Sequence, residues 1–555
     1  MEVKQEITTA IRDALKTMQY ENTESLGIDL SMPKQKGHGD LSTNIAMILA
    51  SRFKKNPRQL AQELVEKLQL DTSIVSHVEV AGPGFINFTL NHLLIHEGLI
   101  DLLKSGDRYG TSNRGQQQKT QVEFVSANPT GPLTIGHGRQ AVLGDTVSRL
   151  LEATGHQVVR EYYFNDAGRQ MRVLGDSVRL RYLELLGESV EFPTDYYMGE
   201  YIREIARKIL KEKGDALKDA AVEDEPCFRD TAESVIFDDI KTTLDRLHIH
   251  FDVFFNEKSL YDSGKIDDVI QTLRKKGLAY NQDGAVWLKA TDLGLDQDRV
   301  IVKSTGEPTY RLPDIAYHRD KMERGFDSII DIFGADHIAT YPDVLAGLEA
   351  LGYDSSKVTV LIHQFVTLTE GKEKIKMSTR KANFITLDEL IDEVGVDVTR
   401  YFFLNRSMSA HLNFDLTLAK TQSDENPVYY VQYAHARICS ILRHARAEGY
   451  DPEASGDASL LKSGEEIDLI KILLDFPRVV AEAAAQFEPQ RIPAYLENLA
   501  TVYHRFQHAG KMNDALRVVT DQPEITQARL MLCQATKIVL GNGLALLGIS
   551  RPEKM

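Results

Sequence analysis

Two short stretches, far apart in the chain, carry residue types that bind phosphates. The first is Phe124–Arg139, with the sequence FVSANPTGPLTIGHGR, and the second is Lys374–Lys381, with the sequence KIKMSTRK. Lysine and arginine side chains, and the free N–H groups at the start of a helix, donate to phosphate oxygens. The two stretches therefore favour chemistry on a nucleotide, in which positioned cations and donors matter more than a covalent nucleophile.

A strand and a helix must position the first stretch. Residues 121–125 read as a buried strand, and a Pro/Gly turn follows them. Apolar residues at helical spacing then predict a helix that begins close to His137: Ala141, Val142, Val147, Leu150 and Leu151. Residues 158–164 predict a second strand, which completes a βαβ unit. The turn matches neither the dinucleotide GxGxxG fingerprint nor a Walker A loop, because no GK[ST] closes it.

A Gly-His element that opens a helix, paired with a distant Lys-Met-Ser, resembles the HIGH and KMSKS motifs of class I aminoacyl-tRNA synthetases. Together with further motifs, the chain resembles the bacterial type of arginyl-tRNA synthetase over nearly its whole length. The resemblance implies ATP-dependent attachment of L-arginine to tRNA(Arg) through an arginyl-adenylate, with release of AMP and pyrophosphate. It implies ATP with Mg²⁺ as a substrate complex, no tightly bound cofactor and no metal held by the protein.

Two positions depart from the family pattern. Thr134 stands where the HIGH motif has its first histidine, and Thr379 stands where KMSKS has its second lysine. Arg380 or Lys381 is then the cation expected to reach the triphosphate. The resemblance implies these catalytic residues: His137, Thr134, Lys376, Ser378 and Arg380. It implies these ATP-binding residues: Pro132, Gly136, His137, Gly138, Asp336, His337 and Met377.

Recognition of arginine is expected to involve buried carboxylates, because a guanidinium is always charged and prefers bidentate acid partners. Asp314 lies in an otherwise apolar segment, so it needs a cationic partner. The alternative is a structural ion pair between Asp314 and Arg311 or Arg319. The resemblance implies these arginine-binding residues: Glu123, Ser126, Asn128, Tyr310, Asp314 and Asp336. Tyr163, Asn165 and Asp166 are weaker candidates at the same sheet edge.

Aromatic residues interleaved with arginine and histidine in the C-terminal part suit stacking on single-stranded bases. Each tyrosine taken alone is equally explained by helix packing. The resemblance implies contacts of the N-terminal part with the tRNA elbow and of the C-terminal part with the anticodon. The predicted tRNA-binding residues are Phe85, Asn87, Tyr429, Tyr433, Arg437, Tyr503 and Arg505.

The expected fold is multidomain α/β. The resemblance implies that residues 1–116 form an added α/β domain, in which residues 78–90 read as two short strands broken by Gly82–Gly84. It implies that residues 117–425 form a class I, Rossmann-like domain with a parallel sheet, which we expect to resume near residues 300–303. That domain carries a helical insertion at about residues 171–295. Strand signals stop at Pro427 and long helical patterns follow, which predicts an all-α bundle over residues 426–555. The resemblance implies that this bundle is an anticodon-binding domain of the DALR type.

The bulk composition places limits on the function. A net charge of −16 disfavours general affinity for nucleic acids, so a tRNA partner must meet local basic patches. Three scattered cysteines exclude a CxxC zinc pattern and suit a reducing compartment. No signal peptide and no apolar run of membrane length is present. We expect a cytoplasmic monomer without membrane contact.

Three rival interpretations remain. A class I synthetase of the cysteine or glutamate type lacks support, because the cysteine type needs zinc ligands that are absent here. A catalytically silent paralogue that binds tRNA is disfavoured by intact Gly136, His137, Lys376 and Asp314. A generic nucleotidyltransferase does not explain the long C-terminal helical region. Adenylate exchange separates an active synthetase from a silent paralogue, and charging of tRNA with each amino acid identifies the type of synthetase.

Overall fold

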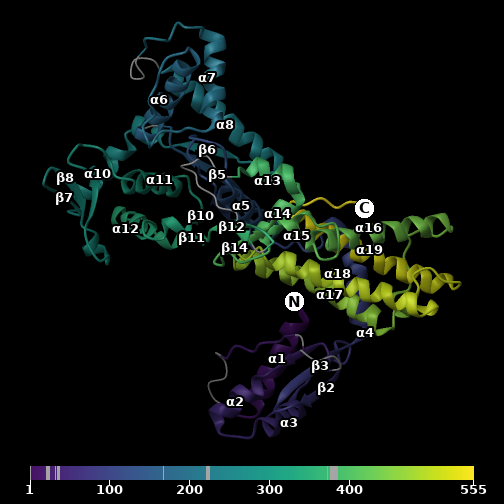
Figure 1. Ribbon diagram of the computed structural model, residues 1–555. Helices are drawn as coiled ribbons and strands as arrows, with labels where there is room; N and C mark the ends of the chain where they lie inside the picture. Colours follow the sequence, from purple (N-terminus) through teal and green to yellow (C-terminus); the bar gives the residue numbers. More distant parts are fainter. Residues whose placement is uncertain are drawn as a thin grey trace.

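The computed structural model describes residues 2–20, 26–31, 33, 38–166, 168–220, 226–371, 373–374 and 385–555. Four bodies follow one another along the chain: an N-terminal domain, a central domain with a parallel sheet, a set of segments inserted into that domain, and a C-terminal helical bundle (Figure 1). No helix in these ranges is long and apolar enough to span a membrane.

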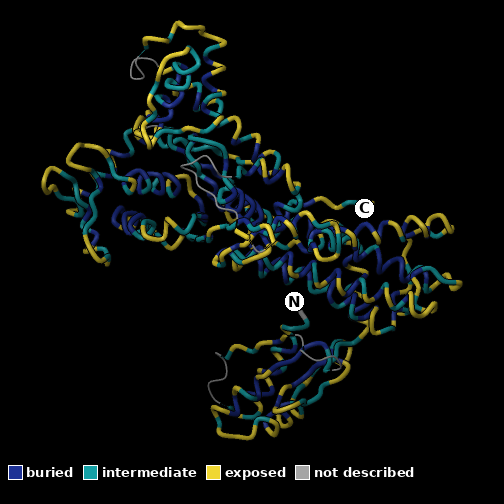
Figure 2. Tube along the Cα trace, in the orientation of Figure 1, coloured by how far each residue is buried: buried dark blue, intermediate teal, exposed yellow. Residues whose placement is uncertain are grey.

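The N-terminal domain has its own core. It contains α1 (Glu2–Thr17), β1 (Leu41–Thr43), α2 (Ile45–Phe53), α3 (Pro57–Lys67), β2 (Val75–Ala81) and β3 (Phe85–Leu90). Its three antiparallel strands lie in the order β1-β3-β2, which confirms the two strands predicted on either side of Gly82–Gly84. The buried residues of this domain form a separate cluster, and α4 (His92–Ser105) leads away from it to the bundle (Figures 1 and 2).

The central sheet contains β4 (Lys119–Glu123), β5 (Gln157–Phe164), β6 (Val253–Asn256), β10 (Ser328–Gly334) and β11 (Val358–His363). All four pairings are parallel, in the order β11-β10-β4-β5-β6. The chain leaves β4 through α5 (Ile135–Ala153) toward β5, whereas β10 and β11 lie on the other side of β4. Open parallel sheets bind ligands at such a reversal point, outside the carboxyl ends of the strands.

The prediction of a single helical insertion over residues 171–295 is wrong in two respects. The insertion is interrupted by a strand of the central sheet, and its second part contains strands as well as helices. The helices α6 (Gly168–Leu185), α7 (Glu200–Lys213) and α8 (Cys227–Arg246) do form an excursion, but β6 then returns to the central sheet. A second excursion follows, with α9 (Lys258–Asp262), α10 (Lys265–Lys275), β7 (Ala279–Gln282), β8 (Ala285–Leu288) and β9 (Arg299–Val302). Strand β9, which we expected to resume the main sheet, pairs with β8 instead. The short strands lack a local signal that assigns them to one sheet or the other.

The second half of the central domain closes over the sheet edge. Helix α11 (Arg311–Glu323) precedes β10, and α12 (Tyr341–Leu351) connects β10 to β11. A small sheet of β12 (Val366–Glu370), β13 (Glu373–Lys374) and β14 (Leu412–Asp415) follows. Helices α13 (Leu387–Val394), α14 (Val396–Leu404) and α15 (Leu416–Lys420) complete this region.

The bundle consists of α16 (Pro427–Ala447), α17 (Gly464–Ala485), α18 (Arg491–Met512) and α19 (Pro523–Leu546), as the helical periodicities predict. Its buried residues belong to the same continuous cluster as those of β4 and α5, so the bundle and the central domain share one core. A buried ionic group joins them as well. Arg400 donates to Asp145 of α5 at 2.5 Å and to the carbonyl of Leu547, just after α19, at 2.7 Å.

Candidate active site

The turn after β4 is held in an unusual backbone conformation. Val125 and Ser126 both have positive φ angles, 69° and 45°, which are rare for residues other than glycine and above all for a β-branched one. The Ser126 hydroxyl donates to Glu123 Oε1 at 2.8 Å, and the Tyr162 hydroxyl donates to the carbonyl of Ala127 at 2.7 Å. Such strain persists only where surrounding contacts enforce it, and it is concentrated at functional sites.

His137 sits in the first turn of α5, at the carboxyl edge of the central sheet. The backbone N–H of Thr134 donates to His137 Nδ1 at 3.2 Å, and the Thr134 hydroxyl accepts from the N–H of His137 at 3.5 Å. Burial lowers the pKa of His137 to about 4, so its imidazole is neutral at neutral pH. Because Nδ1 accepts, the single ring proton must lie on Nε2. Thr134 thus fixes a tautomer whose Nε2–H can donate to a phosphate oxygen.

The second sequence motif lies outside the described residues, and with it Lys376, Met377, Ser378, Thr379, Arg380 and Lys381. Its two flanks are described. On one side β13 ends at Lys374, after pairing with β12. On the other side Thr386 forms a β-bridge with Thr134, and the N–H of Leu387 donates to the carbonyl of Leu133 at 2.9 Å. The chain therefore leaves this motif directly beside the start of α5.

Gly138 is required where α5 meets α13. A Cβ atom at this position would lie 2.5 Å from Leu387 Cδ1 and 3.1 Å from Phe403 Cε2. Helix α13 itself begins with a capping box, in which the Thr386 hydroxyl accepts from the N–H of Glu389. The absence of a side chain at Gly138 therefore lets the segment after the second motif approach the first.

Asp314, in the first turn of α11, has no ion pair with either arginine that we considered as a structural partner. Arg311 Nε donates to Asp343 Oδ2 at 2.5 Å, and Arg319 Nε donates to Glu323 Oε1 at 2.8 Å. Burial, together with the nearby charges of Glu123 and Glu257, raises the pKa of Asp314 to about 7. Within the part of the chain that the structure describes, no hydrogen bond of its carboxylate is present, so this acid is open to an external cation.

Glu257 is a site residue that our sequence reasoning missed. It directly follows β6, so it lies at the same carboxyl edge as the other polar residues. The Tyr163 hydroxyl donates to Glu257 Oε2 at 2.6 Å, and the Tyr163 ring packs against Tyr317 at a centroid distance of 4.5 Å. Burial raises the pKa of Glu257 above its ordinary value. The apolar run Val253–Phe255 before it could have indicated a strand of the central sheet, but we had assigned that region to the insertion.

Glu123 does not offer a free carboxylate. Lys321 Nζ donates to its Oε2 at 2.6 Å, and Ser126 donates to its Oε1. Each carboxylate oxygen of Glu123 accepts one hydrogen bond within the chain and can accept another, so the direct contact between Glu123 and a guanidinium stays a prediction. Asn128 is also engaged: its side-chain oxygen accepts from the N–H of Asn165, and its nitrogen donates to Gln170, each at 3.0 Å.

The remaining predicted site residues lie at the rim of the same edge. Tyr310 is 84% exposed and immediately precedes α11. Asp336 and His337 follow β10 and are exposed, and the His337 ring stacks on Phe333 at 5.0 Å. The charge of Asp336 acts on His137 and on His363, a residue at the end of β11 that sequence reasoning also missed. Asp336 and His363 therefore lie near His137 at the start of α5.

Two of the predicted tRNA contacts are wrong. Asn87 is 3% exposed, and its amide bonds to Ser42 and Glu79 within the N-terminal domain. Tyr503 is completely buried in the bundle. Sequence periodicity placed both residues on the right elements but did not reveal which face of each element is buried. Phe85, at 39% exposure, remains accessible.

The other predicted tRNA residues share one face of the bundle. Tyr429 and Tyr433, one helical turn apart on α16, stack at a centroid distance of 6.1 Å with an interplanar angle of 7°. The His504 ring of α18 stacks on Tyr433 at 6.0 Å. Arg437 and Arg505 are exposed on the same two helices. This combination of stacked rings and cations suits unpaired bases and their phosphates.

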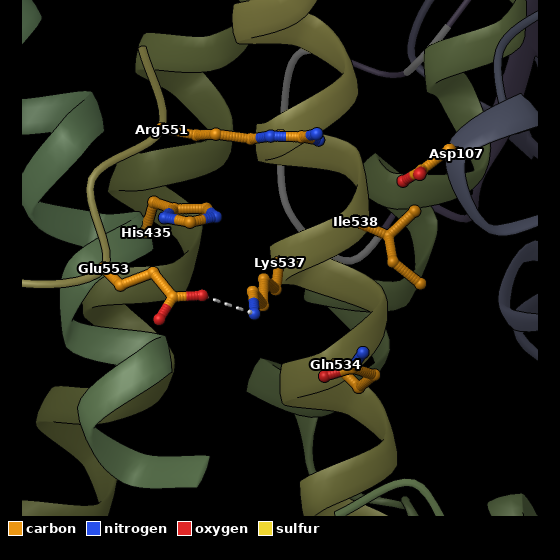
Figure 3. Close-up of a pocket in the computed structure, with 8 residues that line it drawn as sticks. Asp107, His435, Gln534, Lys537, Ile538, Arg551 and Glu553 are labelled. Carbon is orange, nitrogen blue, oxygen red and sulfur yellow. Dashed lines mark ion pairs between the residues drawn. The ribbon is translucent and has the colours of Figure 1, made fainter. Parts of the chain in front are cut away.

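The C-terminal tail closes a cavity elsewhere on the bundle. The cavity measures about 330 Å³ and lies between α16, α19 and the tail (Figure 3). His435 Nδ1 donates to the carbonyl of Pro552 at 2.9 Å, and Lys537 pairs with Glu553 at 3.6 Å. These contacts fasten the tail to the bundle, and none of the residues that line this cavity belongs to the sheet edge described above.

Comparisons with known proteins agree with this arrangement. Residues 5–90, 99–408 and 431–555 match families described as the arginyl tRNA synthetase N terminal domain, the catalytic domain of tRNA synthetases class I (R), and the DALR anticodon binding domain. The arginine–tRNA ligase of Desulfotalea psychrophila is 55% identical over 528 residues, which are 95% of this chain and 94% of that protein. The arginine–tRNA ligase of Salinibacter ruber is 49% identical over 98% of this chain and 100% of that protein.

Solved structures show the same fold. An arginyl-tRNA synthetase structure from Thermus thermophilus superposes with a TM-score of 0.75 at 24% identity and covers 99% of both chains. A structure from Campylobacter jejuni assigned to the same group superposes with a TM-score of 0.77 at 34% identity, over 84% of this chain and 100% of that one.

Proposed function

Because this chain belongs to the arginyl-tRNA synthetase family, whose members charge tRNA with arginine, we propose that Asp314 and Glu257 bind the guanidinium of the substrate. The observation that carries the proposal is the Asp314 carboxylate, which lacks a partner among the described residues and is surrounded by buried polar groups. Glu257 adds a second acceptor, whose Oε2 accepts from the Tyr163 hydroxyl at 2.6 Å and whose Oε1 accepts from the Tyr261 hydroxyl at 3.5 Å. A planar guanidinium between two such acids has donors for both.

The site also explains how arginine is separated from lysine. Lysine has a compact ammonium group with three donors and cannot bridge two carboxylates as a planar fork does. Buried acceptors would then be left unpaired, and sites built around such acceptors discriminate strongly without an editing step. Ser126, Asn128, Tyr310 and Asp336 are the proposed contacts to the rest of the amino acid. Asp336 is also a proposed contact to ATP.

The proposed reaction begins with attack of the arginine carboxylate on the α-phosphorus of ATP, and pyrophosphate leaves. His137 Nε2–H donates to the phosphate oxygens, where it stabilises charge that develops in the transition state. Thr134 holds the His137 ring in the donating tautomer. Lys376, Ser378 and Arg380 are proposed to bind the triphosphate from the second motif. Contacts to the adenosine and phosphate groups are proposed for Pro132, Gly136, Gly138, His337 and Met377.

The second step transfers the arginyl group to the 2′-OH of the terminal adenosine of tRNA. We assign the anticodon to the half-buried ring of Tyr429 and the exposed side chains of Tyr433, Arg437 and Arg505 on the bundle, and the tRNA elbow to Phe85. In a chain with a net charge of −16, such local cations must supply the attraction for phosphates. Magnesium enters with ATP as part of the substrate. A monomeric state and a cytoplasmic location, where bacterial translation takes place, remain predictions.

The test is charging of total tRNA by the purified protein with ATP, magnesium and each of the twenty amino acids in turn. We expect attachment of arginine alone. In Asp314→Asn the KM for arginine should rise roughly 100-fold, as expected for loss of a charge-assisted hydrogen bond. Attachment of a different amino acid would refute the proposed specificity. Binding of tRNA without any charging would support the silent-paralogue interpretation, with Thr134 and Thr379 as its first explanation.

A further inference from the structure

Three acidic residues form a row across the middle of the central sheet. Asp331 of β10 lies in register with Glu123 of β4, and Glu123 lies in register with Glu161 of β5. All three side chains are buried. Carboxylates on neighbouring parallel strands repel one another, and each loses hydration on burial, so the row is tolerated only with cationic and hydrogen-bonding partners.

Helix α11 supplies these partners from one face. Tyr317, His318, Lys321 and Arg324 follow Asp314 at intervals of three and four residues, which places them on one side of the helix and its end. Arg324 donates to both oxygens of Glu161, at 2.6 and 2.8 Å, and the Tyr317 hydroxyl donates to Glu161 Oε1 at 2.6 Å. The same face thus carries the proposed substrate acid at its start and the partners of the acidic row along its length.

Lys321 is at the centre of this arrangement. Its side chain is completely buried, and Nζ donates to Glu123 Oε2 and to Asp331 Oδ1, each at 2.6 Å. It also lies over the Tyr317 ring, 4.4 Å from the centroid. Although burial opposes the charge, Asp331 and Glu123 raise the pKa of Lys321. A buried lysine with two carboxylate partners keeps its charge and ties two strands to one helix.

From Lys321 two short chains of hydrogen bonds lead to the site. Through Glu123 it reaches Ser126, which holds the strained turn after β4. Through Asp331 it reaches His318, whose Nε2 lies 2.8 Å from Asp331 Oδ2 and whose Nδ1 lies 2.7 Å from the carbonyl of Asp314. Both ring nitrogens of His318 thus face oxygen atoms, one on β10 and one on α11.

We infer that Lys321 is a positioning residue for arginine binding: it fixes the turn at Ser126 and the start of α11 at Asp314 relative to each other. This inference rests on the proposed arginine site. Lys321 contacts no substrate, because its side chain is completely buried and Nζ lies against Glu123, Asp331 and the Tyr317 ring. Its effect is therefore expected on the affinity for arginine and not on that for ATP, whose proposed contacts lie around α5.

The experiment measures tRNA charging by full-length variants, with KM values for arginine and for ATP determined separately. Lys321→Met alone leaves buried carboxylates without a cation and can prevent folding. The informative variant is therefore Lys321→Met combined with Glu123→Gln, in which a lysine charge and a carboxylate charge are removed together. We expect at least a 10-fold increase in the KM for arginine, with the KM for ATP changed less than 2-fold.

Two further variants serve as controls. Glu123→Gln alone is the reference for the double variant, because it removes the same carboxylate and keeps Lys321; the KM for arginine of the double variant should exceed that of this single variant by about 10-fold. Lys265→Met removes another lysine that pairs with α11, through Asp320, and should leave both KM values within 2-fold of the original. Circular dichroism and thermal unfolding establish that each variant is folded.

The outcomes separate this inference from the proposed function. A folded double variant with an unchanged KM for arginine overturns the positioning role of Lys321. A KM for arginine that is the same in Glu123→Gln and in the double variant overturns it as well, because the whole effect would then belong to Glu123. If Asp314→Asn itself leaves the KM for arginine unchanged, the proposed arginine site is wrong.

Discussion

Burial shifts the pKa values of Asp314 and His137 in opposite directions. Burial disfavours the charged form of each group, so it raises the pKa of the Asp314 carboxyl to about 7 and lowers that of the His137 imidazole to about 4. At neutral pH the imidazole is therefore neutral and donates through Nε2. The carboxyl is close to the midpoint of its titration, where an arriving guanidinium favours ionisation.

The KM for arginine should depend on pH below about 7. A protonated Asp314 does not attract a guanidinium, so binding below this pH requires loss of a proton. The KM should therefore decrease as the pH rises toward about 7 and level off above it. Measurement of KM between pH 5.5 and 8.5, values chosen roughly to bracket this pKa, tests the expectation. In Asp314→Asn the slope should disappear, and a slope that persists would assign the titration to another group.

Removal of the His137 side chain should affect the chemical step. His137→Ala deletes the Nε2–H donor but leaves the Asp314 side of the site intact. We expect kcat for charging to fall by about 100-fold to 1,000-fold, as for loss of one donor to transition-state charge, while the KM for arginine changes little. Single-turnover formation of the adenylate in the presence of tRNA measures this directly. An unchanged rate would show that the phosphate donors lie elsewhere.

At the scale of elements, the first motif is built from contacts between segments distant in sequence. The start of α5 is capped by Thr134, which also forms a bridge with Thr386 ahead of α13. Arg139 of α5 is completely buried and donates to the carbonyls of Gln364, Ser407 and Ala410. The helix that presents His137 is therefore fixed by the second half of the domain as well as by its own turn.

Gly138→Ala should destabilise this junction. The added Cβ atom meets Leu387 Cδ1 at 2.5 Å, and overpacking of this kind costs about 1–3 kcal/mol. Denaturant unfolding should show the loss, and the KM for ATP should rise because the segment after the second motif moves away from α5. Combination with Leu387→Ala should cost less than the sum of the two single changes. Strict additivity would mean that the two residues do not interact.

On the scale of the whole molecule, the bundle is part of the central domain's core, whereas the N-terminal domain has a core of its own. The contacts of Arg400 with Asp145, Leu547 and Leu247 join α5, the end of α19 and the end of the first excursion at one buried point. The proposed anticodon face and the proposed catalytic edge are therefore connected through packed elements and not through a free linker.

Substitutions on the bundle should separate tRNA contact from packing. Tyr433→Ala removes an exposed ring from the stack with Tyr429 and His504, and stacking on a base contributes about 1–3 kcal/mol. The KM for tRNA should rise accordingly, by about 5-fold to 150-fold. Tyr503→Phe, in contrast, should leave this KM unchanged, because Tyr503 is completely buried. Filter-binding titrations of tRNA with both variants check the difference, and equal losses would contradict the assignment of this face.

Much of the molecule followed from the sequence because the signals are local. The helix after the Pro/Gly turn, the hairpin around Gly82–Gly84 and the four helices of the bundle were predicted from periodicity and turn residues. The same applies to His137 and Asp314, whose residue types and neighbours in the chain pointed to the sheet edge. The family itself was also recognisable from short motifs in their order.

Only the tertiary structure determined the features that depend on the register between strands or on which face of an element is buried. The row Asp331–Glu123–Glu161 exists because three parallel strands align, and no single strand carries a sign of it. The tertiary structure also decides that Glu123 pairs with Lys321 and that Glu257 lies at the site. It buries Asn87 and Tyr503, which excludes them as tRNA contacts. Chain-local patterns determine which elements form, whereas contacts between distant segments determine which polar groups remain available to a substrate.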